Sequence, residues 1–266
     1  MEKTCNDLLD EYRSLAELCD TLEPDQWALR TDFYGWTPWD EIAHLCYFDE
    51  TALQAATDPD AFAAGARALA AEQAEGLEIS AIARRKYGHL DGANLTTLWR
   101  ERFETLVSRL RPLDPKARLP WYGPTMSARS FATARLMECW AHGQDIWDVL
   151  GRSRGPSAGL RHIAHLGVTT YGWAFVNRGL EPPRPMPFIE LHAPDGDRWT
   201  WGELSEERYV RGPALDFALL VTQRRHRSDT ALVWKGEAAE QWTSIAQCFA
   251  GPPADGPPPG LRTRAR

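Results

Sequence analysis

The chain has 266 residues, 43% of them hydrophobic and 25% charged, which is ordinary for a soluble globular protein and enough for one or two domains. A net charge of −7 argues against a general binding surface for nucleic acid or other polyanions. Because the sequence shows neither a membrane-length apolar run nor the basic and apolar start of a signal peptide, we expect a cytoplasmic protein without a membrane or nucleic-acid partner.

Two helices are predicted near the start of the chain. Residues 3–22 carry apolar side chains at helical spacing until Glu23-Pro24 ends the pattern. A second helix is predicted from Thr37, which can cap it, towards Asp58. His44 lies in the middle of this helix among apolar neighbours. It is either a metal ligand or a core histidine that a neighbouring polar group satisfies.

The middle of the chain predicts two more helical segments and a loop. Residues 60–86 are rich in alanine and glutamate and predict a helix, with Gly65 and Gly76 as weak points. Another helix is predicted over residues 95–110. Residues 112–124 combine prolines with aromatic side chains and predict a stiff loop. Its Trp121 and Tyr122 are candidate substrate-binding residues, since the loop leads directly into the next helix.

The helix predicted over residues 135–151 carries the main chemical signal. Glu138, His142 and Asp145 stand at i, i+4 and i+7 and therefore share one face. Glu138 and His142 are two ready metal ligands, and a helical bundle can bring His44 to them as the third. Two histidines and a carboxylate suit zinc with open positions. Iron and nickel stay possible, so the sequence does not fix the metal.

Asp145 has two possible roles beside these ligands. It can accept a hydrogen bond that orients a ligand, or it can act as a catalytic base on bound substrate. Asp40 and Asp49 flank His44 and are weaker candidates for the same role.

A second domain is predicted beyond a short Gly/Ser/Pro stretch at residues 151–159. It begins with a helix over 160–178 and continues with a hairpin, whose strands near 188–192 and 199–201 flank Pro194-Asp-Gly-Asp197. A helix over 214–223, a strand over 231–234 and a helix over 237–249 complete a small α+β domain over residues 160–250. Residues 251–266, with their proline run, predict a disordered tail.

One dense positive run stands out in the folded part of this second domain. It contains Arg224, Arg225 and Arg227. The run is either a solvated helix end or an anion site for a carboxylated substrate or cosubstrate. The sequence leaves both alternatives open.

Three segments carry a family resemblance. They are Trp36-Thr-Pro-Trp-Asp-Glu-Ile-Ala-His44, Pro120-Trp-Tyr-Gly-Pro-Thr-Met-Ser127 and Ala134-Arg-Leu-Met-Glu-Cys-Trp-Ala-His-Gly-Gln-Asp145. They resemble an actinobacterial metal-binding branch of the DinB/YfiT-like superfamily, related to the N-terminal domain of mycothiol-dependent maleylpyruvate isomerase. The resemblance covers residues 5–150 well, and residues 188–250 are similar to the α+β region that accompanies this domain.

The resemblance implies a mainly α protein, with a DinB-like four-helix bundle over residues 1–151 and the small α+β domain behind it. It places a divalent metal on His44, Glu138 and His142. The metal would bind the thiol of mycothiol, lower its pKa and present a thiolate to a small electrophilic substrate, in an isomerase or S-transferase reaction. The arginines at 224, 225 and 227 would then serve as an anion clamp.

Two other functions stay open at this point. The first is a thiol-independent, metal-dependent hydrolase, lyase or cyclase of small-molecule or natural-product metabolism. The second is a non-catalytic metal- or ligand-binding protein. In each case we expect a monomer or a homodimer.

Overall fold

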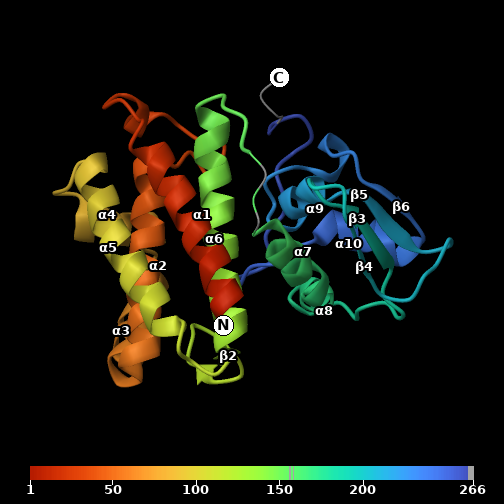
Figure 1. Cartoon of the computed structure of the whole chain (residues 1–266), viewed down its shortest axis with the longest axis horizontal. Helices are drawn as coiled ribbons and strands as arrows, with labels where there is room; N and C mark the ends of the chain where they lie inside the picture. Colours follow the sequence, from red (N-terminus) through yellow and green to blue (C-terminus); the bar gives the residue numbers. More distant parts are fainter. Residues whose placement is uncertain (156, 158, 263–266) are drawn as a thin grey trace. The chain divides into compact units, whose positions relative to one another are not determined.

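The computed structural model describes residues 1–155, 157 and 159–262, and the chain divides into two compact units, Met1–Arg152 and Ser153–Arg266. Most of the regular structure is helical and the sheets are small, which confirms the predicted fold class (Figure 1). In the described part of the chain, no helix is long and apolar enough to cross a membrane. Pro156 and Ala158, inside the predicted connection over 151–159, lie outside the described residues.

Four long helices form the bundle of the first unit. They are α1 (Glu2–Cys19), α2 (Pro38–Thr57), α5 (Gly92–Leu110) and α6 (Ala128–Val149). Helix α2 packs on α5 and α6, and α1 packs on the same two helices, so the four close around one core (Figure 1). Two shorter helices, α3 (Pro59–Ala74) and α4 (Ile79–Tyr87), pack against α2.

The boundaries of these helices follow local chemistry. Thr37 caps α2, because its hydroxyl accepts from the Asp40 amide at 3.3 Å while the Asp40 carboxylate accepts from the Thr37 amide at 2.9 Å. Helix α6 starts earlier than predicted, at Ala128, and is capped by Ser127, whose hydroxyl accepts from the amide of Ser130. The helix predicted over residues 60–86 is instead two helices, since Gly76, with φ of +87°, ends the first of them.

A short hairpin holds the loop that precedes α6. Strands β1 (Arg118–Leu119) and β2 (Met126–Ser127) pair antiparallel, with Arg118 opposite Ser127 and Leu119 opposite Met126. The intervening residues, including Trp121 and Tyr122, are therefore fixed at both ends. A 3₁₀ turn, η1 (Gln26–Ala28), lies between α1 and α2.

The second unit is built on a four-stranded sheet with the order β4-β3-β5-β6. Strand β3 (Phe188–His192) pairs antiparallel with β4 (Arg198–Trp201), as the hairpin signal predicts, and parallel with β5 (Tyr209–Pro213). Strand β6 (Val233–Lys235) pairs antiparallel with β5. The helices are α7 (Leu160–Thr169), α8 (Tyr171–Val176), α9 (Ala214–Val221) and α10 (Glu237–Ile245), with a 3₁₀ turn η2 (Arg227–Asp229).

The last segment differs from the predicted disordered tail over residues 251–266. Its described part, residues 251–262, hydrogen-bonds to the second unit: Asn177 donates to the carbonyl of Gly251, and the Gly260 amide donates to Asp229 at 2.7 Å. The backbone of this proline-rich stretch thus finds polar side-chain partners although it forms no regular element. Residues 263–266 lie outside the described residues.

Candidate metal centre

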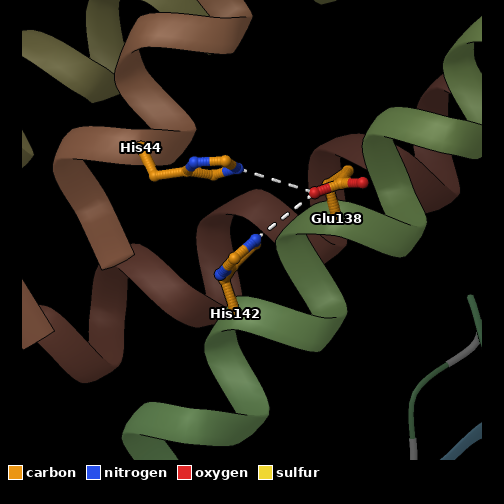
Figure 2. Close-up of side chains that lie close together, drawn as sticks. All are labelled: His44, Glu138 and His142. Carbon is orange, nitrogen blue, oxygen red and sulfur yellow. Dashed lines mark ion pairs between the residues drawn. The ribbon is translucent and has the colours of Figure 1, made fainter. Parts of the chain in front are cut away.

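Three side chains from two helices meet on one side of the bundle. His44 comes from α2, and Glu138 and His142 stand one turn apart on α6 (Figure 2). Glu138 Oε2 lies 3.7 Å from His44 Nε2 and 3.3 Å from His142 Nε2, and the imidazole centroids are 4.4 Å apart. The His142 side chain is 5% exposed, whereas that of Glu138 is 25% exposed, so the cluster has one side open to solvent.

The electrostatics of the cluster favour an ionised carboxylate. Burial raises the pKa of Glu138, but the hydrogen bonds and positive charges of His142 and His44 outweigh it and hold that pKa well below its usual range. The ionised carboxylate and the two imidazole nitrogens together form a donor set for a divalent cation.

Glu41 completes this arrangement, and sequence reasoning missed it. Its Oε2 lies 2.7 Å from Nδ1 of His142, and its Oε1 accepts from the Thr31 hydroxyl at 3.2 Å. The side chain of Glu41 is fully buried. The carboxylate accepts the proton on Nδ1, so Nε2, which faces Glu138 and His44, is the nitrogen of His142 that would hold a metal. The sequence contains one indication of this role: Glu41 precedes His44 by three residues and therefore lies on the same helix face.

The donor atoms of His44, Glu138 and His142 have the arrangement that a divalent metal requires. Both histidines present Nε2 to one carboxylate oxygen, the three donor atoms lie within 4.8 Å of one another, and the proton of His142 is held on the opposite nitrogen. Two nitrogens and one oxygen are donors that zinc accepts, with further positions left for exogenous ligands. The residues therefore fit a divalent metal.

The model of the mycothiol maleylpyruvate isomerase N-terminal domain matches residues 8–147, which include all three donors. The chain belongs to this family. Two uncharacterized proteins from strains of Mycobacterium tuberculosis are 43% identical to it over 250 residues, covering 94% of this chain and 96% of theirs. Solved structures of mycothiol-dependent maleylpyruvate isomerase and of a histidine-to-alanine variant share its fold, with TM-scores of 0.56 and 0.52 at 17% identity. These likenesses cover 88% and 82% of this chain and 92% and 87% of the solved chains.

Asp145 belongs to a second, buried cluster, which it forms with Glu41 and His142. One ligand atom each of Glu41, His142 and Asp145 lie within 4.8 Å of one another, and all three residues are buried. Because Asp145 is 3% exposed, its position favours the predicted orienting role over direct contact with substrate. Its catalytic role stays a prediction.

Asp40 and Asp49, the weaker candidates for the role of Asp145, each bind other partners. Asp40 caps α2 and pairs with Arg84 of α4 at 2.5 Å. Asp49, with no exposed side-chain surface, accepts from Tyr12, from Trp99 at 2.8 Å and from Arg135 at 2.8 Å. Asp49 therefore links α2 to three neighbouring helices and does not have the predicted role beside the metal donors.

Aromatic rings surround the donors. Trp36 stacks on His142 with centroids 5.9 Å apart, and Phe48 lies 4.7 Å from His44. The two predicted substrate-binding residues stand behind Phe48, with ring centroids 6.3 Å away for Trp121 and 5.6 Å away for Tyr122. The loop 120–125 thus contributes to an aromatic wall that adjoins the donors, and substrate binding by Trp121 and Tyr122 stays a prediction.

The three arginines of the predicted anion clamp belong to the second unit. Arg224 and Arg225 are buried, and each donates to a backbone carbonyl, of Thr222 and Arg224 respectively. Arg227 pairs with Glu240 at 2.6 Å and lies over the ring of Trp234. These partners give all three a structural role, and their action on a substrate stays a prediction.

We expect Glu41→Gln to weaken zinc binding by about 10- to 100-fold, the range seen when the hydrogen-bond partner of a histidine ligand is changed. The amide keeps the shape but loses the charge that holds the proton on Nδ1 of His142. Competition with a chromophoric chelator measures the affinity. Glu50→Gln, on the same helix, is the matched control, since Glu50 binds Lys86 and Tyr87. Equal zinc affinity of Glu41→Gln and wild type would contradict this role.

Proposed function

We propose that this protein is a divalent-metal-dependent enzyme that uses mycothiol as its thiol cosubstrate and acts on a small electrophile, as an isomerase or an S-transferase. The observation that carries the proposal is the convergence of His44, Glu138 and His142 at a partly open site inside the matched family region. A metal held there supplies a Lewis acid that lowers the pKa of a thiol. Zinc suits the donors best.

The residues of the chain prepare the site for this chemistry. His44 and His142 keep Glu138 ionised, and Glu41 occupies Nδ1 of His142, which leaves Nε2 as the nitrogen that would hold a metal. Phe48 and Trp36 place apolar rings beside both imidazoles, which excludes water from that side and strengthens electrostatic interactions. Access remains on the side where Glu138 is exposed.

The reaction follows from thiolate chemistry. A thiolate adds to a conjugated double bond of the substrate, whose electron pair moves into the conjugated group and leaves a single bond about which rotation is free. In an isomerase, return of this electron pair restores the double bond and expels the thiolate, whereas in an S-transferase a proton adds to the carbanion and the thioether is the product.

Thermal unfolding of the zinc-loaded protein tests the proposal. Mycothiol at 100 times its dissociation constant should stabilise the wild type by about 2.7 kcal/mol. S-methylated mycothiol, which lacks the free thiol, should stabilise the wild type less at the same concentration. Turnover that depends on metal but not on thiol would instead favour a hydrolase, lyase or cyclase, and metal binding without turnover would favour a binding protein.

A further inference from the structure

Arg135 brings a buried positive charge to the helix that carries Glu138 and His142. Its side chain is 3% exposed, and its Nε donates to Asp49 Oδ1 at 2.8 Å. Burial by itself would lower the pKa of Arg135, but the neighbouring acidic groups, with Asp49 the strongest, outweigh it and raise that pKa. The guanidinium therefore stays charged although little of it reaches solvent.

One arm of this guanidinium has no partner. Nη2 of Arg135 is buried and forms no hydrogen bond within residues 1–155, 157 and 159–262. Asp49 is already occupied, since its Oδ1 accepts from Tyr12 and from the guanidinium Nε, and its Oδ2 accepts from Trp99. Because a buried donor without an acceptor lowers the stability of a fold, this arm of Arg135 points to a ligand.

The unpaired arm belongs to the face of α6 that bears two of the metal donors. Spacings of four, three and four residues place one stripe of side chains along this helix, formed by Phe131, Arg135, Glu138 and His142. Neighbours in such a stripe have Cβ atoms about 5–6 Å apart. The ring of Phe131 contacts Trp121 of the aromatic wall, with centroids 5.0 Å apart. Along the helix, Arg135 thus lies between this aromatic contact and the first donor.

The charge of Arg135 acts on groups on both sides of it. Glu138, a metal donor, is among the acidic groups that raise the pKa of Arg135. Burial raises the pKa of Tyr122 in the loop 120–125, and the hydrogen bond of Thr51 and the charge of Arg135 partly oppose this increase. A substrate between the donors and this loop therefore meets a positive charge in surroundings of low dielectric constant, where electrostatic interactions are strong.

We infer that Arg135 is a catalytic residue, whose Nη2 donates a hydrogen bond to the carbonyl oxygen conjugated with the double bond of the substrate. The inference rests on the proposed function. When the thiolate bonds to the β-carbon, the electron pair of the double bond moves onto this oxygen, and Arg135 stabilises the resulting enolate without losing a proton. Return of the pair breaks the carbon–sulfur bond and restores the double bond. The role restricts the substrates to electrophiles with a carbonyl group next to the double bond.

Two small amides separate this role from a structural one. Acrylamide reacts with a thiolate by conjugate addition, which places negative charge on its carbonyl oxygen, whereas iodoacetamide reacts by displacement of iodide. Both reactions are followed with mycothiol and the zinc-loaded protein. The variant is Arg135→Lys, because lysine keeps the charge beside Asp49 but lacks the second nitrogen of the guanidinium fork. Arg84→Lys is the matched control, since Arg84 pairs with Asp40 of the same helix α2.

We expect Arg135→Lys to lower kcat/KM for acrylamide by about 100-fold or more, the loss seen when one donor to a developing oxyanion is removed. The iodoacetamide reaction, the KM for mycothiol and the zinc content should stay nearly unchanged. Arg84→Lys should match the wild type in both reactions. If Arg135→Lys does not fold, the double variant Asp49→Asn/Arg135→Met, which removes both buried charges together, gives the same comparison.

The other outcomes contradict the inference in distinguishable ways. Equal losses with both amides would show that Arg135 is only structural, and no loss with acrylamide would show that its Nη2 does not contact the substrate. A wild type that accelerates the iodoacetamide reaction but not the acrylamide reaction would overturn the inference and leave the thiol function in place. A wild type that accelerates neither would overturn the proposed function as well.

Discussion

We expect His44→Ala to lower zinc affinity by more than about 100-fold. This is a larger loss than the 10- to 100-fold seen when only the hydrogen-bond partner of a ligand is changed. The reason is that α2 contributes one of the three proposed donors, and Glu138 and His142 alone would leave the ion with two protein ligands. Metal analysis of the purified protein and chelator competition measure the effect.

His89→Ala is the matched control for this experiment. His89 is an exposed histidine of the same unit, in the turn that follows α4. Its replacement should leave zinc content unchanged. Full zinc content in His44→Ala at wild-type affinity would contradict the ligand assignment.

We expect Asp49→Ala to lower the free energy of unfolding by about 3–5 kcal/mol, as when one partner of a buried ion pair is removed. Arg135 is 3% exposed, and its Nη2 has no hydrogen-bond partner within the described residues, so its charge depends on Asp49. Tyr12 and Trp99 would lose the same acceptor. Chemical denaturation followed by tryptophan fluorescence measures the loss.

An exposed ion pair serves as the control for Asp49→Ala. Arg100 and Asp20 pair at 2.8 Å with side chains 37% and 54% exposed, and Asp20→Ala should cost less than about 1 kcal/mol. Adding Arg135→Leu to Asp49→Ala should recover part of the lost stability, because it removes the unpaired buried charge. A cost of Asp49→Ala as small as that of Asp20→Ala would refute this account of the network.

Most of the helices and the positions of the candidate donors could be predicted from sequence because their signals are local. Thr37 caps α2 three residues before Asp40, and the spacing of Glu138 and His142 places both on one helix face. The third donor required a tertiary step, since only the packing of α2 on α6 brings His44 to them.

The features that sequence analysis missed depend on distant partners or on weak local signals. Glu41 looks like an ordinary acidic residue in the first turn of a helix, and only the structure shows it on Nδ1 of His142. Asp49 meets Tyr12, Trp99 and Arg135 from three other helices. Strand β5 contains Gly212 and Pro213, which are unfavourable in strands, and its pairing with β3 and β6 outweighs this preference.

We propose that the donors on α2 and α6 hold a metal that binds the thiol of mycothiol. Titration of mycothiol into the cobalt-substituted protein tests it most directly, because a thiolate ligand adds a sulfur-to-cobalt charge-transfer band in the near ultraviolet. We expect this band in the wild type with mycothiol, and no band with S-methylated mycothiol or in His44→Ala. A cobalt-loaded wild type whose spectrum does not change with saturating mycothiol would contradict the claim.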